Sequence, residues 1–177
     1  HVKRHSFPTR RSSDLTTTLT TGDGGSLVAL VLAADALASR TDADVICVAA
    51  ADEIDRDESP AQLCEAGACV VLGALDPASL QSKGGPPIRL AGWGLAGPRQ
   101  AAAATLRALT SAGLDPSCAP TLDPTPAIRA PAAHPLLRVA VALHRLRAGE
   151  RTSVLLVHDS ASCAAAVIFD CEAPPPT

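Results

Sequence analysis

The stretch from Thr20 to Leu30, TTGDGGSLVAL, decides which fold this chain is expected to adopt. Three of its residues are glycines, namely Gly22, Gly24 and Gly25. Glycine allows backbone angles that other residues resist, and the apolar run after Ser26 predicts a helix that begins directly after this turn. The first N–H groups of a helix have no partner inside it and point toward the turn. This arrangement suits a nucleophile or a bound anion, and the side chain placed there is Asp23.

Apolar periodicity predicts an α/β fold for the rest of the chain. The segments over 26–39 and 136–148 have almost no polar face, which predicts two helices buried between layers, and a third helix is expected over 98–112. Strands are expected over 43–51, 67–74, 86–96, 152–157 and 163–169. The strand over 43–51 is apolar without alternation, as expected when both of its faces are covered. Turn, buried helix, strand and strand occur twice in this order, which favours two related halves.

The two ends of the chain are expected to lie outside this fold. Residues 5–15 resemble one reading frame of a sequencing-adapter oligonucleotide, and the chain contains no methionine, so we expect residues 1–15 to be a disordered artefact at the start of a fragment. Residues 171–177 form a proline-rich tail. Without residues 1–15, eleven basic and seventeen acidic side chains remain, a net charge of about −6. No basic patch is left for a nucleic acid, and the apolar run over 27–34 is too short to span a membrane.

The six cysteines favour a reduced, cytoplasmic protein. Cys47, Cys69 and Cys163 lie in apolar strand-like runs, where a free cysteine behaves as a small buried hydrophobic residue. Cys64 and Cys69 are not accompanied by a histidine pair or a second cysteine pair at zinc spacing. We therefore predict neither a disulfide framework nor a metal site.

Three segments, in this order, resemble the β-ketoacyl synthases of fatty-acid and polyketide biosynthesis, which have the thiolase-like fold. Residues 21–30, TGDGGSLVAL, are similar to the family turn TACSSSLVAL. Residues 43–53, ADVICVAAADE, are similar to the family strand that ends in AGGxE, and residues 64–72, CEAGACVVL, are similar to GEGAGxLVL. The resemblance covers about 16–72, with a weaker echo over 89–169.

The resemblance implies a layered α/β, thiolase-like fold whose N-terminal part is missing. Residues 16–80 would then be part of the N-terminal half of a ketoacyl-synthase-like domain, and residues 86–170 its C-terminal half. The implied site has Asp23 in the position of the family's nucleophilic cysteine. Its acyl or substrate pocket is implied to include Gly22, Gly24, Gly25 and Ser26. Glu53 and Glu65 match the family as structural motif residues.

The catalytic positions depart from the family pattern. The cysteine holds the acyl chain as a thioester, which Asp23 cannot form, and two basic side chains, usually histidines, assist decarboxylation of the malonyl unit. The slot of the second histidine falls between Pro126 and Ala130, and His134 matches it only after a shift. The glycine-rich loop before the last strand is replaced by residues 158–162, HDSAS, whose side chains would form a hydrolytic triad only if they converge in space.

These departures imply a synthase-like protein without condensing activity, similar to the chain-length-factor partners of active synthases. The implied partners are an acyl carrier protein and an active ketoacyl synthase subunit, or a second copy of this chain, with no cofactor. Two alternatives stay open: an active 3-oxoacyl-acyl-carrier-protein synthase, acyltransferase or decarboxylase that uses other residues, and a non-functional gene fragment. Asp23 also has a purely structural interpretation as a cap of the helix that follows it.

Overall fold

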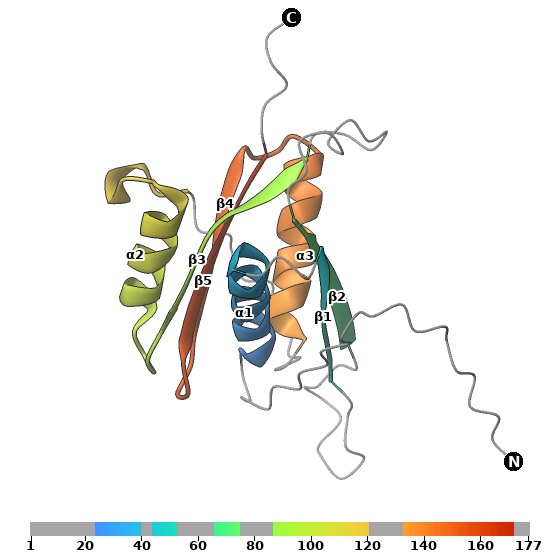
Figure 1. Cartoon of the computed structure of the whole chain (residues 1–177), viewed down its shortest axis with the longest axis horizontal. Helices are drawn as coiled ribbons and strands as arrows, with labels where there is room; N and C mark the ends of the chain where they lie inside the picture. The colour runs from blue at the N-terminus through green and yellow to red at the C-terminus, as the bar shows by residue number, and fades with distance from the viewer. Residues whose placement is uncertain (1–23, 40–43, 53–65, 75–86, 121–132, 172–177) are drawn as a thin grey trace, which may run out of the picture.

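The computed structural model describes residues 24–39, 44–52, 66–74, 87–120 and 133–171 (Figure 1). Their elements follow in the order α1 (Gly25–Ser39), β1 (Val45–Asp52), β2 (Ala66–Gly73), β3 (Ile88–Ala96), α2 (Ala101–Ala112), η2 (Pro116–Cys118), α3 (His134–Arg147), β4 (Ser153–Asp159) and β5 (Ala164–Cys171). All the helices and strands predicted from the sequence are present, which confirms the α/β content. The predicted disordered start over 1–15 and the tail after Cys171 lie outside the described residues. None of the helices within these ranges has the length and apolar character that crossing a membrane requires.

The elements form four layers in the order helix, sheet, helices and sheet (Figure 1). Helix α2 covers one face of a three-stranded antiparallel sheet with the strand order β3-β5-β4. Helices α1 and α3 lie side by side on the other face of this sheet and separate it from the two-stranded antiparallel sheet β1-β2. Both apolar helices are thus buried between layers, as predicted. That the chain consists of two related halves stays a prediction.

Strand β5 lies at the centre of the core because it is paired on both sides and covered on both faces. One set of its side chains packs with α1 and α3: Ala165, Val167 and Phe169. The alternate set packs with α2: Ala164, Ala166 and Ile168. Each of these side chains is 2% exposed or less, which explains why the sequence of β5 is apolar without alternation.

Helix α2 approaches β3 closely because two glycines of the strand face it. A Cβ atom on Gly92 would lie 2.2 Å from the carbonyl oxygen of Ala108, and one on Gly94 would lie 2.4 Å from that of Ala104. Both alanines are fully buried, so small residues meet on each side of the contact. A register shift between Leu90 and Gly92 makes β3 irregular at the same place.

Most boundaries differ from the prediction by one or two residues; Cys171, for example, was assigned to the tail but ends β5. Two differences have a clear cause. Helix α2 begins later than position 98, because Arg99 has a φ of 56°, which a right-handed helix does not accommodate. Strand β4 continues past position 157, since its pairing with β5 runs without interruption to the pair of Asp159 and Ala164. His158 and Asp159 therefore end a strand and do not belong to the loop that follows.

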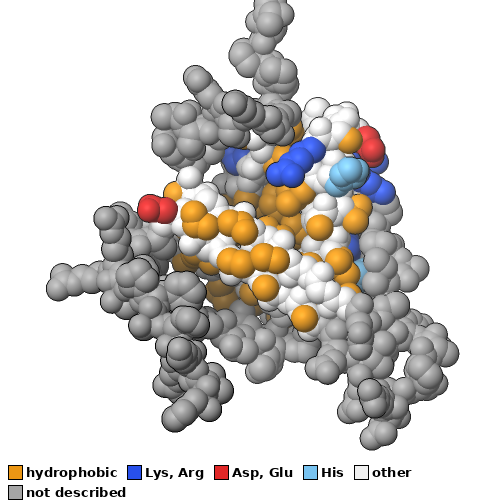
Figure 2. Space-filling view, turned by 90° about the vertical axis from the view of Figure 1, so that its right-hand side faces the viewer, with side chains coloured by type: hydrophobic (Ala, Val, Ile, Leu, Met, Phe, Trp, Pro, Cys, Tyr) orange, Lys and Arg blue, Asp and Glu red, His pale blue; other side chains and the backbone are white. Residues whose placement is uncertain are grey.

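The outer face of the β1-β2 sheet is exposed, so the prediction that both of its faces are covered is wrong for the described part of the chain. Val48 and Val70 are partners in the ladder and pack against the helices. Val45 and Val71 point away and are 61% and 63% exposed. Figure 2 looks at this side of the molecule and shows hydrophobic side chains gathered over the two strands. The strands are apolar on both faces, but the described layers bury only the inner one.

Candidate functional site

Helix α1 begins at a glycine turn, as the sequence predicts. Gly24 has a φ of 88°, and its carbonyl oxygen accepts hydrogen bonds from the N–H groups of Leu27 at 3.0 Å and Val28 at 3.2 Å. The N–H groups of Gly25 and Ser26 come before this pair, so they have no acceptor inside the helix and point to its start. Negative charge is stabilised at such a place, because the unpaired N–H groups carry partial positive charge.

The imidazole of His158, at the end of β4, lies directly against Gly24. A Cβ atom on Gly24 would lie 2.1 Å from Cδ2 and 2.3 Å from Nε2 of this ring. Only a residue without a side chain permits this approach, so the observed position of the His158 ring requires glycine at position 24. His158 is not among the predicted site residues, because its proximity to Gly24 depends on how the turn before α1 meets the end of β4, which no local pattern encodes. The available signal was the histidine at the end of an otherwise apolar strand.

A buried positive charge lies next to this histidine in the fold. Arg138 of α3 is only 6% exposed, and its Nη1 donates a hydrogen bond of 2.9 Å to the carbonyl oxygen of Val157, the residue before His158. A guanidinium stays protonated throughout the physiological pH range. Its charge is felt strongly in the low dielectric of the interior, so it favours negative charge near the end of β4.

Ser26, at the start of α1, is the other buried polar or charged residue of the described chain besides Arg138. Its side chain is 5% exposed, and its Oγ has no hydrogen-bond partner among the described residues. A buried hydroxyl in this state costs about 1–3 kcal/mol. A polar group brought within reach of Ser26 would remove this cost and be bound favourably.

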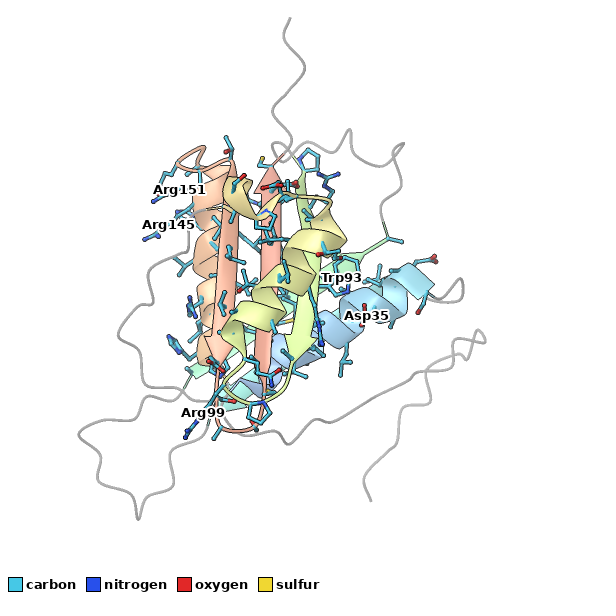
Figure 3. The ribbon with its side chains drawn as sticks, turned by 90° about the vertical axis from the view of Figure 1, so that its left-hand side faces the viewer. Asp35, Trp93, Arg99, Arg145 and Arg151 are labelled. Atoms are coloured by element: carbon cyan, nitrogen blue, oxygen red, sulfur yellow. The ribbon has the colours of Figure 1, made fainter. Side chains whose placement is uncertain are left out.

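The hairpin between β4 and β5 holds the end of β4 through hydrogen bonds made by Ser160. The Ser160 Oγ donates to the carbonyl oxygen of Cys163 at 2.9 Å and accepts from the Cys163 N–H at 3.2 Å. The Ser160 carbonyl oxygen accepts from the N–H of Arg99 at 3.2 Å, which ties the hairpin to the turn before α2 (Figure 3). The Ser160 hydroxyl thus serves the hairpin, which disfavours a hydrolytic triad of residues 158–160.

The structure brings three of the predicted site residues together. Gly24, Gly25 and Ser26 lie buried at the start of α1. The other predicted residues lie outside the described part of the chain: Gly22, Asp23, Glu53 and Glu65. Within the described ranges, no three His, Cys, Asp or Glu side chains are grouped as a metal site requires.

An open groove with a volume of about 400 Å³ lies between α1, β3 and α2 and is a second candidate site. It is lined by Val31, Asp35, Trp93, Gly94, Leu95, Arg107 and Ser111. Trp93 Nε1 donates a hydrogen bond to the Asp35 carboxylate (Figure 3). Arg107 Nη1 donates one to the carbonyl oxygen of Leu95. Asp35 lies about 14 Å along α1 from Ser26, so this groove is separate from the site at the start of the helix. Its charged groups already bond to protein atoms, which makes it the weaker candidate.

The layered arrangement of the chain matches a solved structure. A crystal structure of a β-ketoacyl synthase from Burkholderia phymatum STM815 superposes on 87% of this chain with a TM-score of 0.67. This chain shares its fold with part of that synthase. The two sequences are 11% identical, and the chain spans 61% of the length of that synthase, so the likeness concerns the fold alone. No family model matches the sequence, and no curated protein sequence is similar to it.

The β-ketoacyl synthase fold agrees with the family that residues 21–30 resemble. It therefore supports the thiolase-like α/β class predicted from the sequence, although the roles of the individual site residues stay predictions. The start of α1, where His158 packs against Gly24 and Arg138 bonds to the end of β4, is the candidate binding or catalytic site of this fold.

Proposed function

We propose that this chain is part of a β-ketoacyl-synthase-like protein of fatty-acid or polyketide biosynthesis that does not itself condense acyl chains. The observation that carries the proposal is the start of α1. The sequence there resembles the family turn, within a chain that shares the fold of a synthase, but the residue before Gly24 is Asp23 instead of a cysteine. A carboxylate is a poor acceptor for a thioester-bound acyl group, because the mixed anhydride that it forms hydrolyses readily.

The packing of His158 supports the same proposal. Its ring occupies the space directly beside Gly24, and the hairpin that follows β4 is held by the hydrogen bonds of Ser160. Position 23 precedes Gly24 in the chain, so we infer that this ring would limit the room for an acyl chain attached there. This supports a role without an acyl-enzyme intermediate.

The proposed role is that of a chain-length-factor-like partner. In this role the protein would pair with an active ketoacyl synthase subunit, or with a second copy of itself, and would meet an acyl carrier protein in the cytoplasm. The free thiols of Cys47, Cys69, Cys163 and Cys171 agree with a reducing compartment.

The test of this proposal is acylation of the purified protein. We expect no stable mass gain when it is incubated with an acyl-acyl-carrier-protein donor, and no condensation when a malonyl donor is added. Asp23→Cys is not expected to restore condensation, because the basic residues that assist decarboxylation are also absent from the matched positions and such groups act as a unit. A changed product length on pairing with an active synthase would support the partner role. A stable acyl adduct on Asp23 would refute the proposal.

A second candidate function, decarboxylation of a malonyl thioester, is favoured by the position of His158. This reaction needs no nucleophile: the bond between the carboxylate and the α-carbon breaks, carbon dioxide leaves, and the electron pair forms an enolate that takes a proton to give the acetyl thioester. Negative charge develops on the thioester oxygen. The start of α1 and the imidazole of His158 would stabilise that oxygen, and Arg138 adds a positive charge at the end of β4.

The decarboxylase candidate is tested with malonyl-coenzyme A alone and detection of acetyl-coenzyme A. Activity should fall at least about 100-fold in His158→Gln, because one oxyanion donor contributes about 2.7–4 kcal/mol to such a reaction. His144→Gln is the matched control, since His144 is an exposed histidine on α3. No acetyl-coenzyme A above the uncatalysed rate, or equal activity in both variants, would exclude this candidate and leave the partner role.

A further inference from the structure

Two cysteine thiols meet on the exposed face of the β1-β2 sheet. The Sγ atoms of Cys47 in β1 and Cys69 in β2 lie 3.2 Å apart, and both thiols are free. In the ladder Cys47 pairs with Val71 and Ala49 pairs with Cys69, so the two cysteines are diagonal neighbours on the same side of the sheet. Their distance is short enough for one thiol to donate a hydrogen bond to the other sulfur.

Cys47 and Cys69 are exposed because the described helices cover only the inner face of the β1-β2 sheet. Val48 and Val70 fill the inner face against α1 and α3, and alternation along each strand turns their neighbours outward. Cys47 and Cys69 are both exposed to solvent, whereas Cys163 and Cys171 are half-buried near opposite ends of β5. Of the described cysteines, only Cys47 and Cys69 combine exposure with a neighbouring thiol.

We infer that Cys47 and Cys69 form a reversible redox site, in which a small disulfide such as oxidised glutathione converts the two thiols into one intramolecular disulfide. In the first step, one cysteine thiolate attacks a sulfur of the small disulfide and releases one thiolate. The second cysteine thiolate then attacks the protein sulfur of this mixed disulfide and releases the other. Two electrons pass from the protein to the small disulfide, and the two cysteine protons end on the two released thiols.

The pair is close to the geometry that the product needs. The S–S bond of a disulfide is about 2.05 Å, so the sulfurs have to approach each other by about 1.2 Å. Diagonal neighbours in a sheet are farther apart than directly opposite ones, so the two strands have to shift slightly, and the side chains to rotate, before the bond can close. A disulfide formed in this way is strained, and strained disulfides are readily reduced, which agrees with a reversible site. The pKa of Cys69 is raised by its hydrogen bond with Cys47, then by loss of hydration, then by the charge of Cys47. Cys69 therefore keeps its proton to a higher pH than an ordinary exposed thiol, and either cysteine can make the first attack.

The experiment treats the full chain with oxidised glutathione and maps its tryptic peptides without reduction. Trypsin cleaves after Arg40, Arg56 and Lys83, so Cys47 and Cys69 fall in different peptides, over 41–56 and 57–83. We expect these peptides to be joined, with the loss of two hydrogen atoms from the intact mass and no retained glutathione. Addition of reduced dithiothreitol should reverse the link.

Cys64 shares the second peptide with Cys69, so single variants identify the partner. The matched control Cys64→Ser should keep the link, whereas Cys69→Ser should lose it, and Cys47→Ser should retain one glutathione on Cys69. Phenylarsine oxide, which bonds to two neighbouring thiols at once, gives a second measurement on the unmodified chain and should protect both cysteines from alkylation. Glutathione retained on Cys47 and Cys69 without a link, or a link that is lost in Cys64→Ser and kept in Cys69→Ser, would overturn the inference.

Discussion

At the scale of single residues, the contact between Gly24 and His158 determines what the start of α1 can contain. Two separate costs would fall on any side chain at position 24: the φ of 88°, and a ring atom 2.1 Å from the new Cβ. Gly113 offers a comparison, because its φ is 68° but no atom lies within 4 Å of the position of its Cβ. The difference in stability between alanine variants at these two glycines therefore measures the effect of the contact with His158.

Gly24→Ala is expected to lower the free energy of unfolding by about 2–4 kcal/mol, from backbone strain together with overpacking. Gly113→Ala should cost only the strain, about 1–2 kcal/mol. Urea denaturation of both variants measures the difference. Adding His158→Ala to Gly24→Ala should recover the part due to the clash, as a double-mutant cycle will show. Equal losses in the two single variants would mean that the ring does not press on position 24.

The raised pKa of Cys69 predicts a pH dependence at the same scale. A group with a raised pKa holds its proton to a higher pH, and only the thiolate reacts with iodoacetamide, so alkylation of Cys69 should begin at a higher pH than that of an ordinary exposed thiol. Cys47→Ala removes the hydrogen bond and the charge of the neighbour, which should shift the midpoint of the rate profile to lower pH. Mass spectrometry of the peptide over 57–83 in a Cys64→Ser background follows the rate. An unchanged midpoint would show that Cys47 does not act on Cys69.

At the scale of elements, the tight packing of α2 on β3 depends on the glycines of the strand. Gly92→Ala would place a Cβ atom 2.2 Å from a backbone oxygen of α2 and 2.7 Å from the Cβ of Ala112. Because helix backbone cannot move aside as a side chain does, we expect a loss of about 1–3 kcal/mol in the free energy of unfolding. Gly97→Ala is the control, since its Cβ would only touch the flexible side chain of Gln100 at 3.5 Å. Thermal unfolding should separate the two variants, and similar melting temperatures would contradict the close packing.

Element boundaries show how far the sequence predicts the fold. The helix predicted over 26–39 is observed as α1 (Gly25–Ser39). The prediction is correct because the apolar run can be read from neighbouring residues, and a helix that is apolar all round is buried between layers. The start of α2 was mispredicted, since Pro98 favours a helix start but Arg99 takes a positive φ. The burial predicted for Cys47 and Cys69 is wrong, because an apolar run does not reveal which face of its strand will be covered.

At the scale of the whole molecule, stability should decrease from the centre of the layers outward. Strand β5 is paired on both sides and covered on both faces, whereas in the described part of the chain β1 and β2 pair only with each other and have one exposed face. Amide hydrogen exchange is therefore expected to be slowest for Ala165 to Phe169 and faster throughout β1 and β2. Rates corrected for intrinsic exchange, measured by mass spectrometry of peptides, test this order. Equal protection of the two sheets would show that they open as one unit.

The sequence by itself determined the elements of this protein, because helix and strand periodicity, glycine turns and apolar runs act over a few neighbouring residues. It also indicated the turn at the start of α1 and, through residues 21–30, the fold that the solved synthase structure shares. Only the tertiary structure placed His158 against Gly24, buried Arg138 beside the end of β4, and brought two thiols together on an exposed face. These contacts join residues far apart in the chain. They depend on which layers meet and which face of each strand is left open, and short-range patterns carry no information about either.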